Sequence, residues 1–253
     1  MARALASYVI CGTPRSGSTL LCEMLGATGV AGRPNSFFRP VDILWWAKAW
    51  GVPYPYGADG PEFDRDYLSA MRREGSAGTG VFGLRLMWDS VTEASRRLSV
   101  ALGTDRDVAL NLEAAFGPTL FIHVSRSDKI AQAVSRVRAE QSGVWHLAAD
   151  GTVLEGDESA QPTVYDGNRI ADLVDELRSH DEAWSRFFED RGISPLRLVY
   201  EDVTANPWAA LGSILAGLGL DPAIARSIPV KTAKMADEES RIWVERFRQG
   251  SAT

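Results

Sequence analysis

Four short runs of apolar residues punctuate the chain, and longer stretches with helical spacing of apolar positions separate them. The runs cover residues 8–11, 81–87, 119–124 and 196–200. The third run, TLFIHV, is almost continuously apolar, which is typical of a strand buried on both faces. Strands that alternate with helices predict an α/β fold, in which helices flank a central, mainly parallel sheet in three layers.

Residues that favour helix ends bound the helical stretches. Gly29 suits the end of the first helix, and Ser127 suits the start of a long one, with Asp128 at its favourable N-terminal end. The acidic, aperiodic segment 148–163 is predicted to be a mobile loop. The predicted helices cover residues 16–28, 41–50, 64–74, 90–102, 105–116, 127–147, 168–191, 207–218 and 237–248.

The composition changes between residues 30 and 61. This segment holds three tryptophans, two phenylalanines and two tyrosines among prolines and glycines. It interrupts the alternation of strands and helices, so we predict loop structure around one short helix. The chain of 253 residues shows no internal repeat and no clean boundary, and it is predicted to form one domain with this aromatic segment as an insertion around residues 30–61.

Charge and cysteine content exclude several classes of protein. The formal net charge of −6 argues against general nucleic-acid binding, which leaves a basic surface. The two cysteines, Cys11 and Cys22, lack the spacing of metal ligands and predict a reducing cytoplasm. No secretory leader is recognisable, and no stretch approaches the roughly 20 apolar residues of a membrane span. A cytoplasmic protein without a membrane span is the expectation.

The stretch YVICGTPRSGSTLLCEML combines the first strand, a tight turn and a helix start. Backbone N–H groups and the positive end of a helix dipole meet in such a turn, which favours an anionic ligand. Gly12 and Gly17 are five residues apart, as in a Walker A loop, but Ser18 occupies the lysine position and Arg15 is the only cation of the loop. The residues predicted to surround the anion are Thr13, Pro14, Arg15, Ser16, Gly17, Ser18 and Thr19.

A second cationic turn follows the third strand. Arg126 stands in the sequence Ser-Arg-Ser, and Ser135 follows nine residues later on the next helix. Ligands of open parallel sheets lie beyond the carboxyl ends of the strands, so both turns are expected at one edge. Two anion sites there suit a nucleotide with phosphates at its 5′ and 3′ ends. The alternative for Arg126 is an ion pair with Asp128 or another carboxylate.

Several motifs together resemble one enzyme family. TPRSGSTLL, HVSRSDKIAQAVS and YEDVTANPWAALGSILAGLGL are similar to the P-loop-type sulfotransferases that use 3′-phosphoadenylyl sulfate (PAPS). RSGSTLL, ATGVAG, the paired phenylalanines, GLRLMW and SRIWVERFR resemble most closely the bacterial branch typified by trehalose 2-sulfotransferase. The resemblance implies that residues 13–19 hold the 5′-phosphosulfate, that Arg126 and Ser135 hold the 3′-phosphate, and that Lys231 and Lys234 close over the nucleotide.

Sulfuryl transfer moves an anionic group between two oxygens nearly in line, so catalysis depends on positioning and on cations that offset charge. Arg15 is predicted to offset the charge of the leaving group, and no metal is expected. The acceptor hydroxyl also needs a base. The resemblance places a glutamate before the paired phenylalanines, where this chain has Ser36.

Three other residues are candidates for the base, and the sequence leaves the choice open. Asp42 lies in the aromatic segment, where it could instead cap the short helix. Asp89 follows the second strand and could equally be an N-cap. His146 titrates near neutral pH but could be structural beside a tryptophan. His123 lies within an apolar strand and is predicted to be a core residue.

The aromatic segment is predicted to bind the acceptor. Carboxylates and aromatic rings commonly hold neutral sugars. The resemblance implies acidic residues where this chain has Arg33 and Ser36, so the aromatic rings are kept and the acids are lost. Arg33 and Arg39 could instead face an anionic or lipid-like acceptor. The alternative is a local hydrophobic cluster of Trp45, Trp46 and Trp50 beside solvated arginines. Exposed aromatic residues here could also form a homodimer contact. The predicted acceptor residues are Arg33, Ser36, Phe37, Arg39 and Trp45.

Two other functions remain in competition with a sulfotransferase. A P-loop kinase or NTPase would need the loop lysine and an apolar strand that ends in a metal-binding acid, whereas the third strand ends in His-Val-Ser-Arg. A nucleotide-binding relative without transferase activity would keep the anion sites and lack the base at Ser36.

Overall fold

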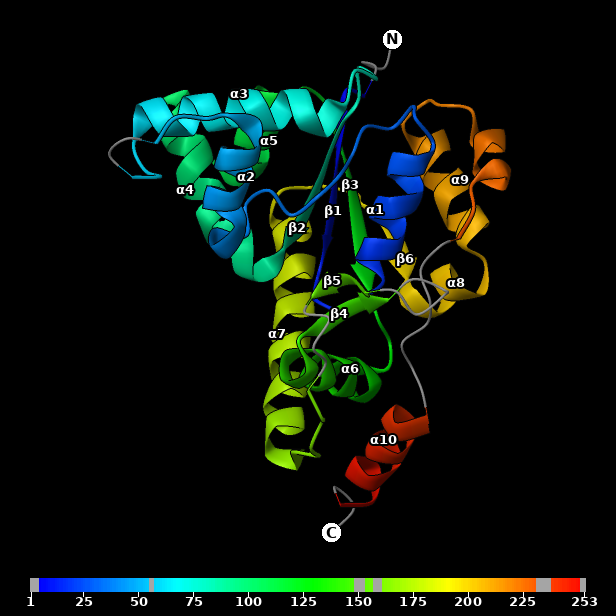
Figure 1. The fold of residues 1–253 in the computed structure, drawn as a ribbon. Coiled ribbons are helices and arrows are strands. Elements are labelled where there is room, and N and C mark those ends of the chain that lie inside the picture. Colours follow the sequence, from blue (N-terminus) through cyan, green and yellow to red (C-terminus); the bar gives the residue numbers. More distant parts are fainter. Residues whose placement is uncertain (1–4, 55–56, 148–152, 157–160, 231–237, 251–253) are drawn as a thin grey trace.

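Four parallel strands form the centre of the molecule in the computed structural model, which describes residues 5–54, 57–147, 153–156, 161–230 and 238–250. The strands lie in the order β2-β1-β3-β6 (Figure 1). The α/β fold class and the positions of all four predicted strands are confirmed. Their bounds are β1 (Ser7–Gly12), β2 (Phe82–Met87), β3 (Thr119–Ser125) and β6 (Leu196–Val199).

One face of the sheet packs against α1 (Ser18–Ala27) and α9 (Pro207–Gly217). Side chains alternate along a strand, so Tyr8 and Ile10 of β1 point to this face and are fully buried. Full burial of a side chain such as Ile10 contributes about 1.5–3 kcal/mol. This layer places the start of α1 directly beyond the end of β1.

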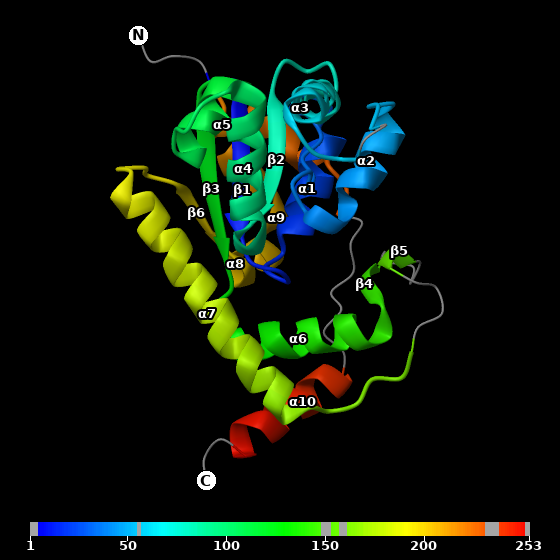
Figure 2. The same ribbon diagram turned by 90° about the vertical axis from the view of Figure 1, so that its left-hand side faces the viewer.

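The other face packs against α3 (Pro61–Ser76), α4 (Val91–Leu102) and α5 (Val108–Phe116). Val9 and Cys11, the alternate residues of β1, point to this face. Figures 1 and 2 show the sheet between the two helical layers. Because both faces are covered, the strands are mostly apolar, as their sequences predicted, although β2 contains Arg85 and β6 contains Arg197.

A smaller hydrophobic cluster joins α6 (Lys129–Ser142), α7 (Gly167–Asp190) and α10 (Glu238–Gly250) below the sheet (Figure 2). The first half of α7 contributes Ile170, Leu173 and Leu177 to this cluster. The second half contributes Trp184 and Phe188 to the core on the sheet. The helix α7 therefore ties the lower helices to the end of β1.

The helix predicted over residues 127–147 was wrong at its end, because α6 stops at Ser142. Gly143 adopts a left-handed conformation with φ 74°, which terminates the helix. The next residues, at the end of the predicted helix, form β4 (Val144–Leu147). This strand is antiparallel to β5 (Val153–Gly156), which lies within the segment predicted to be a loop. At the other end Asp128, rather than Ser127, caps α6 through a hydrogen bond from the Ala131 N–H at 3.0 Å.

The remaining elements are short. Tyr200, predicted to end the fourth strand, instead begins α8 (Tyr200–Ala205). The aromatic segment contains α2 (Ile43–Trp50), as predicted. Short 3₁₀ helices cover Pro40–Asp42, Trp88–Ser90 and Pro222–Ser227. In the part of the chain that the structure describes, no helix has the length and hydropathy to cross a membrane.

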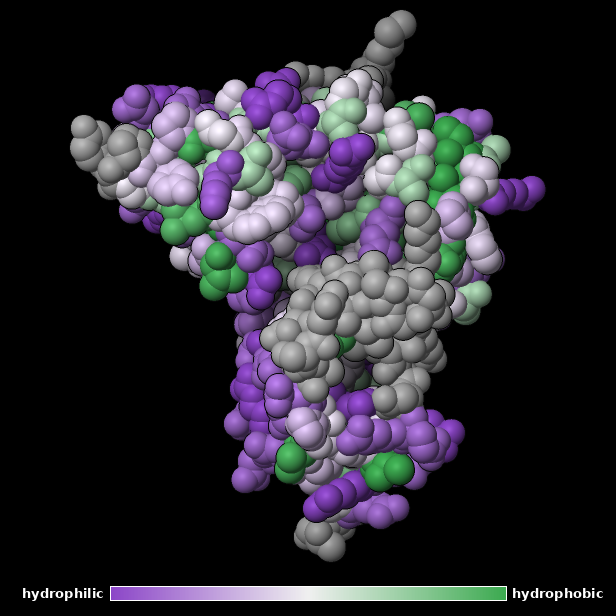
Figure 3. All heavy atoms as spheres, viewed as in Figure 1, coloured by the Kyte–Doolittle hydropathy of each residue, from purple (hydrophilic) through white to green (hydrophobic). Residues whose placement is uncertain are grey.

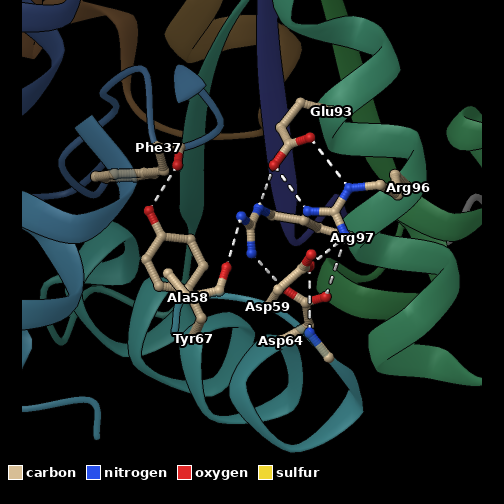
Figure 4. Close-up of polar contacts among 9 residues, drawn as sticks. Phe37, Ala58, Asp59, Asp64, Tyr67, Glu93, Arg96 and Arg97 are labelled. Carbon is tan, nitrogen blue, oxygen red and sulfur yellow. Dashed lines mark hydrogen bonds and ion pairs between the residues drawn. The ribbon is translucent and has the colours of Figure 1, made fainter. Parts of the chain in front are cut away.

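A buried charge network connects α3 with α4 (Figure 4). The guanidinium of Arg97 forms an ion pair with Asp64, whose side chain is fully buried, and a second with Glu93 at 2.6 Å. It also donates to the backbone oxygen of Ala58 at 3.1 Å. Burial raises the pKa of the Asp64 carboxyl, and Arg97 opposes this shift. The network therefore fixes the chain just after the aromatic segment.

Candidate active site

The loop between β1 and α1 is tightly folded against its neighbours. A side chain at Gly12 would place its Cβ 2.7 Å from the backbone oxygen of Val124, and one at Gly17 would lie 2.8 Å from the Tyr200 ring. Gly17 has a φ of 85°, and Arg15 is also left-handed at 66°. That conformation costs about 1–2 kcal/mol for a residue with a Cβ. The loop therefore holds Arg15 in a strained but defined position.

Hydrogen bonds from two helices fix the backbone of the loop. The Gln132 amide of α6 donates to Thr13 Oγ1 at 2.9 Å and to the Pro14 oxygen at 2.7 Å. The Trp184 indole N–H of α7 donates to the Gly12 oxygen at 2.9 Å. Gln132 and Trp184 are buried, so these bonds are shielded from water. The loop is thus organised before any ligand binds.

An ion pair between α6 and α7 completes this support. Lys129 pairs with Asp181 and donates to the backbone oxygen of Arg126 at 2.6 Å. Asp181 in turn accepts a hydrogen bond from the Thr13 hydroxyl at 3.4 Å. The turn after β3 and the loop after β1 are therefore held by the same pair of charges.

Arg15, Arg126 and Ser135 lie together, as the sequence predicted. Gly12 and Val124 are paired in adjacent strands, which places the two turns side by side. The Arg15 Nε donates to Ser135 Oγ at 3.0 Å, and the Arg126 Nη1 lies 3.4 Å from the Arg15 oxygen. Arg15 also donates to the backbone oxygen of Trp145 in β4.

Arg126 is buried, and it forms no ion pair with any carboxylate of the described residues. Its guanidinium lies 4.3 Å from the centroid of the Tyr200 ring, and burial lowers its pKa. Asp128, the alternative partner, instead pairs with Arg248 at 2.9 Å. Among the described residues, neither Arg126 Nε nor the buried Ser16 Oγ has a hydrogen-bond partner. A buried cation beside unsatisfied polar atoms is expected where an anionic ligand binds.

A small cavity of about 160 Å³ opens beside the loop. Arg15 and Ser18 line it from the loop, and Ser36 and Asp89 line it from the opposite side. Arg85 of β2 joins the two sides, because it donates to Thr19 Oγ1 at 2.5 Å and to Ser36 Oγ at 2.7 Å. Hydroxyl and cationic groups therefore converge where the loop ends.

A larger cavity of about 760 Å³ adjoins the small one, and both are lined by Thr19, Arg39 and Arg85. Arg33 and Trp45 of the aromatic segment line only the larger cavity. Its volume suits a disaccharide-sized ligand. Four of the five predicted acceptor residues thus line one or both cavities: Arg33, Ser36, Arg39 and Trp45.

The aromatic residues divide between the core and the surface. Phe37 is 3% exposed and packs edge-on against Trp46 and Trp50, with centroids 5.2 and 5.3 Å away, so it lies behind the cavity wall. Trp45 is 62% exposed beside the exposed Val41 and Leu44. Figure 3 shows hydrophobic side chains at the lower edge of the α2 region. The cluster predicted as the alternative therefore forms. Trp46 stacks on Trp50 with centroids 5.1 Å apart and meets Trp45 edge-on at 4.5 Å, and Trp45 is also exposed to solvent.

Comparison with known proteins identifies the family. Residues 7–250 match the Stf0 sulphotransferase family. The chain belongs to this family. It is 31% identical to the trehalose 2-sulfotransferase of Mycobacterium tuberculosis (strain ATCC 35801 / TMC 107 / Erdman), covering 98% of this chain and 96% of that one. The trehalose 2-sulfotransferase of Mycolicibacterium smegmatis is also 31% identical, with 96% and 94% covered.

A solved structure, a sulfotransferase from Alicyclobacillus acidocaldarius, is similar at a TM-score of 0.45 and 14% identity, covering 99% of this chain and 93% of that one. The predicted resemblance to sulfotransferases of the trehalose 2-sulfotransferase type is confirmed by the family match and by the two curated relatives.

The candidate bases of this Stf0 sulphotransferase occupy different places. Asp89 lines the small cavity and accepts a hydrogen bond from the Ser90 hydroxyl at 2.9 Å. Asp42 precedes α2 without a capping hydrogen bond from its side chain, lines the larger cavity and pairs with Arg39 at 3.3 Å. His146 lies in β4, and its side chain is outside the described part of the structure.

Other predicted residues can be placed more briefly. His123 is a core residue as predicted, since it is 5% exposed and burial lowers its pKa. Lys231 and Lys234 lie outside the described residues. Among the residues that are described, no group of three or more His, Cys, Asp or Glu side chains could hold a metal ion.

Sequence reasoning missed four residues of the candidate site: Arg85, Gln132, Trp145 and Asp181. Arg85 carried a recognisable signal, because it is a cation within the apolar strand FGLRLM. Gln132 and Asp181 lie on helix faces whose partners are distant in sequence. Trp145 depended on a hairpin that was predicted as helix and loop.

Proposed function

We propose that this Stf0 sulphotransferase moves a sulfuryl group from PAPS to a hydroxyl group of a carbohydrate. The observation that carries the proposal is that Arg126, a buried cation without a described carboxylate partner, lies against Arg15, which lines the small cavity. The names of the two curated relatives support a carbohydrate acceptor.

The loop of residues 13–19 would hold the 5′-phosphosulfate, and Arg126 with Ser135 would hold the 3′-phosphate. The fit rests on chemistry in this chain. Arg126 is buried without a described carboxylate partner, and the Ser16 hydroxyl is buried without a described hydrogen-bond partner. A phosphate oxygen accepts hydrogen bonds from both kinds of group.

Bound PAPS would supply a sulfuryl group on a phosphate leaving group. Arg15 offsets the negative charge that grows on that phosphate as the S–O bond breaks. Asp89 lines the same small cavity and takes up the proton of the acceptor hydroxyl while the new O–S bond forms. Ser36 carries no charge at neutral pH and instead accepts a hydrogen bond from Arg85. Asp89 is therefore the base that we favour over Asp42, which pairs with Arg39.

Two measurements test this function. Calorimetry without magnesium should detect binding of adenosine 3′,5′-bisphosphate, and mass spectrometry should detect a sulfated sugar after incubation with PAPS and a sugar panel. Magnesium-dependent ATP binding without any binding of the bisphosphate would instead indicate a kinase or NTPase. Bisphosphate binding without turnover on any sugar would indicate a relative that lacks transferase activity.

A further inference from the structure

Arg85 is a cation whose described partners are all neutral. Its Nε donates to Ser36 Oγ at 2.7 Å and its Nη1 to Thr19 Oγ1 at 2.5 Å. No carboxylate within the described residues forms an ion pair with it. A hydroxyl group accepts a hydrogen bond but contributes no negative charge. The positive charge of Arg85 is therefore left for a ligand.

Two of the other three arginines at the small cavity have carboxylate partners, and the third, Arg15, belongs to the loop proposed to hold the donor. Arg136 pairs with Glu140 at 2.9 Å and with Glu176 at 2.8 Å, which raises its pKa against the effect of burial. Arg39 pairs with Asp42. Arg136 and Arg39 thus have carboxylate partners within the protein, whereas Arg85 has hydroxyl partners only.

The larger cavity extends this positive region away from the loop. Arg33 lines it, is exposed, and forms no hydrogen bond or ion pair with another described side chain. Five arginines and three carboxylates line the two cavities together. Of these, three arginines and two carboxylates line the larger cavity, so an excess of one positive charge lies where the acceptor would be bound.

We propose that the acceptor is an acidic sugar, whose carboxylate, phosphate or sulfate group is bound by Arg85 and Arg33. The inference rests on the proposed function and names its substrate class. A guanidinium offers a fork of N–H donors that fits the two oxygens of such a group. The anionic group would lie beside the hydroxyl that is sulfated, because Arg85 lines the small cavity as well as the large one.

Matched sugars test the inference directly. Trehalose and trehalose 6-phosphate, and glucose and glucuronic acid, should be compared as acceptors with PAPS. We expect kcat/KM to be at least about tenfold higher for the acidic member of a pair, as for a charge-assisted hydrogen bond. Equal or better use of the neutral sugars would overturn the inference. Comparison of glucuronic acid with its octyl glycoside shows whether the acceptor is a free sugar or a lipid-borne one. Preference for either of the two supports an acidic group on the acceptor.

Ser36→Glu tests the role of Arg85 by placing a carboxylate against its Nε. The added carboxylate should neutralise Arg85, so the variant should lose the roughly tenfold preference for acidic over neutral sugars, measured as the ratio of their kcat/KM values. Ser36→Ala removes the hydrogen bond without adding charge and should retain the preference. A Ser36→Glu variant that still prefers acidic sugars would overturn the assignment.

Arg85→Gln is the second variant, in case the buried position 36 does not accept glutamate and the thermal melting temperature falls. It should lower kcat/KM for acidic sugars more than kcat/KM for neutral sugars, so the ratio of the two should fall about tenfold. An equal loss for both would mean that Arg85 serves the donor, and the inference would be wrong. If no sugar is sulfated at all, the proposed function fails, and calorimetry of the same sugar pairs still decides whether acidic sugars bind better.

Discussion

The loop of residues 13–19 and the aromatic segment of residues 33–50 border the same cavities, but their charges are held differently. The loop is fixed by buried groups from α6 and α7, and its neighbour Arg126 is itself buried. The arginines of the aromatic segment are exposed, and Arg39 forms an ion pair with Asp42, three residues away. One side is organised before binding, and the other meets solvent.

This contrast follows from the cost of buried charge. A buried guanidinium without a partner is expensive, so the donor side is stable only in combination with many fixed contacts. An exposed ion pair contributes about 0–1 kcal/mol, so its residues can change with little effect on folding. We infer that the acceptor side can change its specificity while the donor loop stays intact. Ser36 is an example, since it lies where the resemblance implies a glutamate.

The largest expected effect comes from the buried ion pair between α3 and α4, which supports the acceptor side. Arg97→Met leaves the fully buried Asp64 without its main partner and should lower the free energy of unfolding by about 3–5 kcal/mol. Chemical denaturation would measure this loss. If the two regions are independent, the folded variant should bind adenosine 3′,5′-bisphosphate with unchanged affinity. A parallel loss of nucleotide affinity would contradict the separation of the two sides.

Arg15→Ala, on the donor side, should reduce activity rather than stability. The side chain that offsets leaving-group charge is lost, so kcat should fall by about 10²–10³ with little change in thermal stability. Steady-state kinetics with PAPS would measure this. Arg39→Ala is the matched control from the acceptor side, and its effect should lie mainly in KM. Full activity of Arg15→Ala would show that Arg15 only supports the loop.

The donor side could be predicted because its information is local. Gly12, Arg15 and Gly17 lie within six residues, and the rule that ligands gather at the carboxyl ends of parallel strands brought Arg126 to the same edge. Ser135 follows on the helix that begins at this edge. No contact between distant segments had to be guessed for these residues, apart from the pairing of β1 with β3.

The acceptor side depends on contacts that sequence patterns do not specify. Arg85 meets Ser36 across 49 residues, and Trp145 reaches Arg15 only through the β4–β5 hairpin. Gly143 is a residue type that often ends helices, but the helical spacing of apolar positions was given more weight, so the helix was predicted to continue past it. Within the aromatic segment, composition could not separate the buried Phe37 from the exposed Trp45, because that division depends on which face of α2 meets the core.

Asp89→Asn tests the small cavity, where the donor side and the acceptor side meet. It removes the proposed base but keeps an oxygen that can accept the Ser90 hydrogen bond, so kcat should fall by about 10²-fold or more while folding is retained. Asp42→Asn is the comparison, and we expect it to alter KM more than kcat. A larger kcat loss in Asp42→Asn would move the base to the exposed acceptor segment.

Arg126→Gln should give the smallest effect of the four, because it acts on nucleotide binding and leaves Arg15 in place. Loss of a charged hydrogen-bond donor should weaken binding of adenosine 3′,5′-bisphosphate by about 10- to 100-fold, measured by calorimetry. Adenosine 5′-phosphate, which lacks the 3′-phosphate, should bind the variant and the unmodified chain almost equally. Arg33→Gln, an exposed arginine of the acceptor side, should leave the bisphosphate affinity unchanged. If Arg126→Gln weakens both nucleotides alike, Arg126 acts by supporting the loop through the Arg15 oxygen, and the 3′-phosphate must be bound elsewhere.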